Sequence, residues 1–494
     1  MLDEGTSCLD HVFCHPWHSR IWTVQEVAFS KQCQVVCGYS SLSWTLYFKA
    51  AKFLIFEQWI DTLSLQASRH MVALDMRNVV RNYVLGTADE DDTSTGEDSG
   101  DENTSDRAQK QIAFLTSCLS DLNQLQATEP KDKIYGIHAM YINLGVPLPP
   151  VDYGSSLASI YAGAARAVIS WSQSLRILRD ACSTNRDPTL PSWVPDWSDT
   201  SARLFMPTGY ANKAFHFKYT NLTAPPGDGS KLAVRGTVIG EIVSSGDGGI
   251  MMPFPTRQSS TDLIILSSDE YKVVDDVEFL RLMIDKIRLF RALLRTIEAN
   301  PELSQNDDWN EVIHELLTLG KPSFRDDLFD EFLDILSYPH GQCNQSIGEA
   351  LVKKWVAADI ANTNQWTPEL INCATIVASL VVNHSITVNG RPLPSQADVI
   401  ELVKELSENL GDHTVVTVQL THNTSRTFGT TFQAVTHSDQ VVLVEGADWP
   451  IVLRPSGQNY TFVGPAFVLG MMEDEAISQE LMSQSSKLRL FTLV

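Results

Sequence analysis

The stretch from Thr87 to Arg107, TADEDDTSTGEDSGDENTSDR, is the feature that most limits how this chain can fold. It carries nine carboxylates against one cation, Arg107, and it has no large apolar side chain with which to build a core. We therefore expect residues 87–107 to form an acidic, disordered loop that separates residues 1–86 from the rest of the chain. Nine carboxylates minus one cation give −8 of the formal net charge of −23 at pH 7.

The composition of the whole chain bounds its class. Its 494 residues have room for about three domains, and 43% hydrophobic with 20% charged residues is typical of a globular protein. A net charge of −23 disfavours nucleic-acid binding and docking on anionic lipid, since both attract clustered Lys and Arg. We therefore expect no nucleic-acid partner.

The sequence also indicates a cytoplasmic protein. Its longest apolar run, Ala374–Val382, has nine residues, whereas a membrane-spanning helix needs about twenty. The first residues, MLDEGTSCLDHVF, lack the basic and apolar regions of a secretory signal, and eight Cys are too few for a disulfide scaffold. We predict no membrane span and cytoplasmic localisation.

Hydrophobic periodicity predicts a mixed α+β fold. Apolar spacings of three and four predict helices over 109–125, 156–170 and 275–298, with further helices around 309–337, 347–361 and 396–410. Alternation over 231–243 predicts a half-buried strand, and residues 414–470, rich in Val, Thr and Phe, predict a small β-rich module. The apolar stripe of the 275–298 helix is expected to be core; it comprises Phe279, Met283, Ile287, Phe290, Leu294 and Ile297.

A cluster of Cys and His near the start raises the question of a metal site. Its members are Cys8, Cys14, His15, His18, Cys33 and Cys37. Structural zinc sites use two close pairs of ligands, and only Cys33 and Cys37 have an acceptable spacing. Cys33, Val35 and Cys37 share one face of a strand-like run, where Cys behaves as a small apolar residue. We therefore expect no metal.

The sequence offers one candidate catalytic segment. It has no Gly-rich phosphate loop, GxSxG elbow or HExxH pair, so we expect no cofactor, and we interpret the isolated His138, His340 and His437 as structural. In the segment 19–26, SRIWTVQE, Trp22 and Glu26 share one face of a predicted helix. A carboxylate that loses water beside an indole suits acid–base chemistry, but a surface glutamate at the helix start, or one paired with Arg20, is the favoured interpretation.

Cys14–Trp44, CHPWHSRIWTVQEVAFSKQCQVVCGYSSLSW, resembles the third conserved block of the fungal heterokaryon incompatibility (HET) domain proteins. That block reads approximately PW..R.WT.QE......V.CG......W. The matching residues are Pro16, Trp17, Arg20, Trp22, Thr23, Gln25, Glu26, Cys37, Gly38 and Trp44. Later segments resemble the family in the same order: DKIYGIHAM at 132–140, VDYGSSLASIYAGAARAVI at 151–169, LPSWVPDWS at 190–198, LAVRGTVIGEI at 232–242 and VLVEGADWPIVLRPSGQNYTFVGPAFVLGMMEDEA at 442–476.

Two departures from the family pattern matter. The blocks that resemble Y.ALSY.WG and WID.LCINQ have no counterpart, because the sequence begins inside the third block, so we expect a truncated HET domain. The Gly-Asp of the closing module is Ser438-Asp439 here, and the Gly before Glu475 is Asp474. Glycine often serves turns that need a positive φ, so the local backbone is in question at both places.

The resemblance divides the chain into parts. We expect the C-terminal part of an α/β, TIR-like HET domain at 1–86, the acidic loop at 87–107, a HET-associated α/β region at 108–245, a mainly helical region at 246–412 and a β-rich C-terminal module at 413–494. The missing blocks would leave sheet edges or apolar surface uncovered, as an aggregation risk or an oligomer interface.

The resemblance implies a role in fungal non-self recognition and programmed cell death, through contacts with other proteins of an incompatibility pathway. HET domains are likened to TIR domains, some of which cleave NAD with a helix glutamate, and the TIR pattern S..WC..E is similar to Ser19, Trp22 and Glu26. A nucleotide pocket of this type also needs the first strands, so we expect no NAD cleavage. A TIR-like enzyme with Glu26 as catalytic carboxylate is the alternative, and a remnant without function is the third interpretation.

Overall fold

The computed structural model describes residues 11–56, 125–182, 185–199, 229–243, 251–254, 277–299, 411–421, 425–432, 435–472 and 488–494, with short pieces elsewhere. Apart from single positions, several predicted segments lie outside the described residues: the acidic loop 87–107, the helix 109–125 and the helices around 309–337, 347–361 and 396–410.

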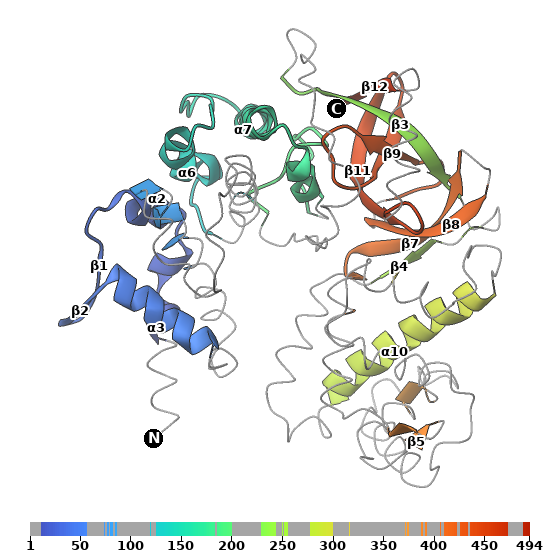
Figure 1. The fold of residues 1–494 in the computed structure, drawn as a ribbon, viewed down its shortest axis with the longest axis horizontal. Helices are drawn as coiled ribbons and strands as arrows, with labels where there is room; N and C mark the ends of the chain where they lie inside the picture. The colour runs from blue at the N-terminus through green and yellow to red at the C-terminus, as the bar shows by residue number, and fades with distance from the viewer. Residues whose placement is uncertain are drawn as a thin grey trace, which may run out of the picture. The chain divides into compact units, whose positions relative to one another are not determined.

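The chain is a mixed α+β protein, as its periodicity predicts, and it forms two compact units. The first comprises Met1–Arg203, Lys218–Val234 and Thr492–Val494, and the second comprises Leu204–Phe217 and Arg235–Phe491. The described part of the first unit is mostly helical, whereas that of the second contains a large antiparallel sheet (Figure 1).

Short helices and one hairpin build the first unit. Its elements are η1 (Pro16–Ser19), α2 (Trp22–Phe29), β1 (Gln34–Cys37), β2 (Ser40–Ser43), α3 (Trp44–Phe56), α6 (Asp132–Asn143), α7 (Leu157–Ser172) and η4 (Arg176–Ala181). The predicted helix over 156–170 is confirmed as α7, which begins where the Ser156 side chain accepts a hydrogen bond from the Ser159 N–H. It ends at Gln173, whose positive φ of 55° stops the helix.

An eight-stranded antiparallel sheet builds the second unit. Its strands are β3 (Leu232–Ile242), β4 (Met251–Pro253), β7 (His413–Leu420), β8 (Arg426–Phe432), β9 (Gln440–Val444), β10 (Ile451–Ser456), β11 (Asn459–Val468) and β12 (Arg489–Leu493). The strands predicted over 231–243 and within 414–470 are therefore confirmed as strands. The half-buried character expected of 231–243 is wrong, because β3 is buried on both faces except at Arg235, Val238 and Glu241. A small separate pair is formed by β5 (Thr387–Val388) and β6 (Arg391–Pro392).

The sheet closes on itself through β3. The strands β10, β9, β3, β7, β8 and β11 each pair with the next, and β11 pairs back with β10. Figure 1 shows β3, in green, running among the orange and red strands of the last hundred residues. The closed sheet encloses an apolar cluster that includes Ile239, Val418, Val441 and Val468. The β-rich structure thus extends beyond residues 413–494 to β3, which ends at Ile242, 171 positions before β7 begins at His413.

The helix predicted over 275–298 is confirmed as α10 (Val277–Glu298). Of its predicted apolar stripe, Ile287, Phe290, Leu294 and Ile297 are buried, while Asp285 and Arg288 on the other side are exposed and form an ion pair at 3.3 Å. The side chains of Phe279 and Met283 lie outside the described residues. Across the parts of the chain that the structure describes, no helix is both long and apolar enough to cross a membrane.

We predict that Gly236→Ala strongly destabilises the closed sheet. A Cβ atom at position 236 would lie 2.2 Å from the backbone carbonyl oxygen of Leu443 in β9, so the strands would have to separate. We expect a loss of about 3 kcal/mol in the free energy of unfolding, measured by urea denaturation with circular dichroism. Gly229→Ala is the control, because a Cβ there meets no atom within 4 Å. Equal stability of the two variants would contradict this packing.

Candidate functional site

The elements η1 and α2 position the residues that the sequence analysis proposed as catalytic. Ser19 ends η1, Trp22 begins α2, and Glu26 follows one turn later, so the predicted shared helix face of Trp22 and Glu26 is confirmed. Ser19 is buried, Trp22 is half-buried, and Arg20 and Glu26 are exposed. The Glu26 backbone carbonyl accepts a hydrogen bond from the Ser30 hydroxyl near the end of the helix.

Gln126 anchors the turn between η1 and α2. Its backbone N–H donates to the Ser19 carbonyl at 2.5 Å, and its carbonyl accepts from the Ile21 N–H at 3.0 Å. The Ser19 hydroxyl lies 3.3 Å from the Gln126 side-chain oxygen and 2.9 Å from the Pro16 carbonyl. Ser19 is therefore engaged in holding two chain segments together.

The carboxylate of Asp132 joins three segments of the chain. The Trp22 indole Nε1 donates to its Oδ2 at 3.2 Å, and the Tyr153 hydroxyl donates to its Oδ1 at 2.6 Å. The hydrogen bond to Asp132 is the main cause that raises the pKa of Tyr153 to about 12. Asp132 opens α6, where a carboxylate also interacts favourably with the helix dipole. We call Trp22, Asp132 and Tyr153 the Asp132 junction.

The loop before α7 is tied to α6 beside this junction. The Tyr135 hydroxyl donates to the Asp152 carbonyl at 2.7 Å and accepts from the Asp152 N–H at 3.0 Å. The Asp152 carboxylate accepts from the Ser155 hydroxyl and the Gly154 N–H, and these two hydrogen bonds lower its pKa. The rings of Tyr135 and Tyr153 meet edge to face at 4.9 Å.

The geometry pairs Trp22 with Asp132 rather than with Glu26. Within the described residues, the polar partner of the Trp22 indole is the Asp132 carboxylate, 110 positions away. Sequence reasoning quoted Asp132 and Tyr153 inside the segments DKIYGIHAM and VDYGSS but did not propose them as site residues. The sequence signal that could have found this site was an acidic residue, Asp132, in one matched segment and an aromatic residue, Tyr153, in another.

A buried arginine holds the other side of η1 and α2. The Arg77 guanidinium is fully buried and donates to the His18 carbonyl at 2.6 Å and to the Thr23 hydroxyl at 2.9 Å. Burial lowers the pKa of Arg77 to about 10. His18 is buried as well, with its Nε2 atom 3.2 Å from the Tyr47 hydroxyl.

Lys133 and Asp196 are a second pair of buried charged residues. Lys133 directly follows Asp132 of the junction in the sequence. The Lys133 ammonium donates to the Leu125 carbonyl, and burial lowers the pKa of Lys133 to about 8, partly offset by the charge of Asp196. Asp196 accepts from the N–H of Asp187 and of Ser198. Tyr161 packs edge to face on Trp197 at 5.0 Å, and its burial raises the pKa of the Tyr161 hydroxyl.

The Cys and His residues near the start do not converge. His18 bonds Tyr47, the His15 ring accepts from the Trp17 N–H, and Cys37 is exposed. Cys33 packs on the cluster around Trp44, and burial raises the pKa of its thiol. Among the described residues no three His, Cys, Asp or Glu side chains gather as metal ligands, and Cys8 lies outside those residues.

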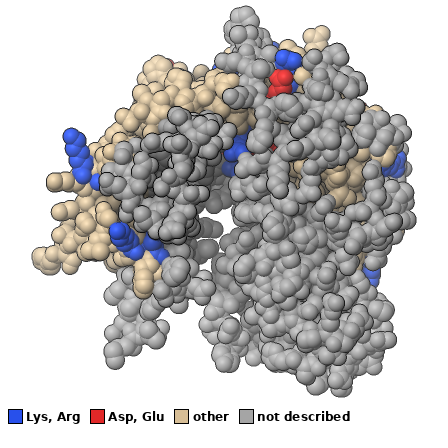
Figure 2. Space-filling model, in the orientation of Figure 1, with Lys and Arg blue, Asp and Glu red and all other residues tan. Residues whose placement is uncertain are grey.

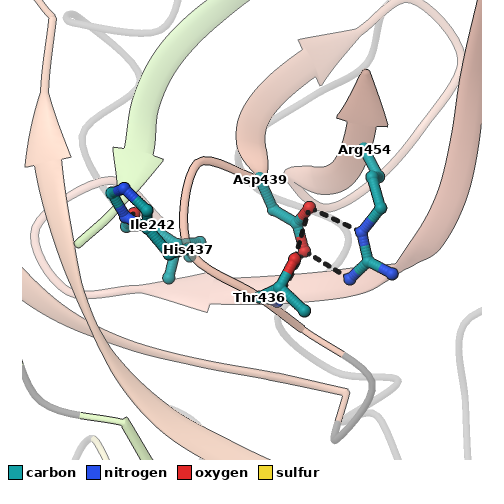
Figure 3. A network of polar contacts seen from close by, with 5 residues as sticks. All are labelled: Ile242, Thr436, His437, Asp439 and Arg454. Carbon is teal, nitrogen blue, oxygen red and sulfur yellow. Dashed lines mark hydrogen bonds and ion pairs between the residues drawn. The ribbon is translucent and has the colours of Figure 1, made fainter. Parts of the chain in front are cut away.

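The closed sheet of the second unit has its own ion pair, between Asp439 and Arg454 (Figure 3). Asp439 is buried, and its carboxylate accepts from Arg454 Nε at 2.9 Å and Nη2 at 2.8 Å. The Thr436 N–H and hydroxyl also donate to Asp439. The hydrogen bonding of Arg454 to Asp439 raises the pKa of Arg454. The pair connects the turn before β9 to β10.

The turn at Ser438 keeps a glycine-like backbone. Ser438 stands where the HET pattern has Gly, and its φ is +67°. Its N–H donates to the Ile242 carbonyl at 3.1 Å, while the Ile242 N–H donates to the Asp439 carbonyl at 2.9 Å. These two hydrogen bonds fix the turn on the end of β3 and hold a conformation that disfavours a side chain.

Comparisons of the chain with known protein families, with curated proteins and with solved structures find no match.

We predict that Lys133 makes the protein more stable as the pH rises from 8 to 10. The unfolded chain holds the Lys133 proton up to its usual pKa of 10.5, whereas the folded chain releases it near 8, so rising pH favours the folded state. The contribution should grow by about 2 kcal/mol over this range. Urea denaturation at pH 8 and pH 10 should show this increase in the free energy of unfolding in the wild type and not in Lys133→Met.

Lys52→Met, which changes an exposed lysine, is the control for that experiment and should retain the wild-type pH response. An identical response of Lys133→Met and the wild type would contradict the role of Lys133.

We predict that Arg454→Met costs about 2 kcal/mol of stability, because it leaves the Asp439 carboxylate buried without its cation. The estimate is below that for a fully buried pair, since the Arg454 side chain is 37% exposed. Combining Arg454→Met with Asp439→Asn should cost less than the sum of the single changes, measured in a double-mutant cycle. Additive losses would show that the two residues act independently.

Proposed function

We propose that this chain belongs to the fungal HET family and acts in non-self recognition and cell-death signalling, through contacts with other proteins of an incompatibility pathway. The observation that carries the proposal is the Asp132 junction. Its three members come from the matched segments at 14–44, 132–140 and 151–169. The side chains of Trp22 and Tyr153 both donate a hydrogen bond to the Asp132 carboxylate. Segments that resemble one domain family should be in contact if they form that domain.

Two other matched segments support the same interpretation. In LPSWVPDWS, Trp193, Val194 and Trp197 are buried, and the Trp193 indole donates to the Ser230 carbonyl at 2.8 Å. In the closing segment, Arg454 holds the buried Asp439. Trp193 and Arg454 thus have structural partners, which suits a protein that acts by presenting a surface.

The alternative is a TIR-like enzyme that cleaves NAD with Glu26. The observation in its favour is that Glu26 is exposed on a helix whose first residue, Trp22, is fixed by Asp132, so its carboxylate is open to a ligand from solvent. A nucleophilic or acid–base carboxylate must also be held in reach of its substrate. We therefore favour the role in protein interactions over the enzymatic role.

Expression in a filamentous fungus, scored for growth arrest and for cellular NAD, separates the two roles. If the chain acts through protein contacts, the wild type and Glu26→Gln should both arrest growth at constant NAD, and Asp132→Ala should lose the effect because its three segments separate. Glu129→Ala, which changes an exposed acid in the segment just before α6, is the control and should remain active.

Loss of NAD that depends on Glu26 would establish the enzyme instead. Normal growth with the wild type would contradict a self-sufficient death effector. Trp22→Phe and Tyr153→Phe each remove one hydrogen bond to Asp132 and should give intermediate effects, at protein levels checked by immunoblot.

A further inference from the structure

We draw no further inference here: the strongest candidate, the outer face of helix α3, tan and blue in Figure 2, where Leu46 and Phe53 are exposed, carries no proposal because nothing in the described part of the chain shows what covers it.

Discussion

Backbone carbonyl groups in irregular segments are the constraint on which the first unit depends. A buried carbonyl that no helix or sheet satisfies must find another donor. Cationic side chains supply it repeatedly: Arg77 bonds the His18 carbonyl, Lys133 bonds that of Leu125, and Arg186 bonds those of Ala181, Ser192 and Val194. Burial lowers the pKa of each of these cations, so the loops gain hydrogen bonds at an electrostatic cost. Such contacts give the loops between the helices of this unit a defined structure.

The Asp132 junction is likewise a structural rather than a reactive group, because its hydrogen bonds are used to join segments of the chain. Both oxygens of its carboxylate accept hydrogen bonds from side chains of other segments, and nearby Tyr135 fixes the following loop. The exposed groups of this region are different ones, among them Glu26 on α2 and Leu46 and Phe53 on α3. Some matched residues, such as Thr23, Trp44 and Trp193, are buried, so contacts with another protein would have to use exposed groups instead.

Sequence reasoning succeeded where the signal was local. The regular apolar spacing in α7 and α10 and the alternation in β3 predicted those elements, because each pattern repeats within one segment. It did not predict that β3 pairs with β7 and β9, since strand pairing over long separations leaves no periodic trace. Nor did it identify Asp132 as the partner of Trp22, 110 positions away, or the burial of Arg77, a residue type that is mostly exposed.

The closure of the sheet through β3 has a consequence for synthesis of the protein. β3 ends at Ile242, but β7 begins only at His413, so 171 residues must be added before the ring can start to close. At usual rates of translation this takes roughly 10 to 35 seconds. During that time the strands that pair with β3, namely β7, β9 and β12, are not yet on the growing chain. The second unit should therefore fold late, after the first unit has most of its sequence available.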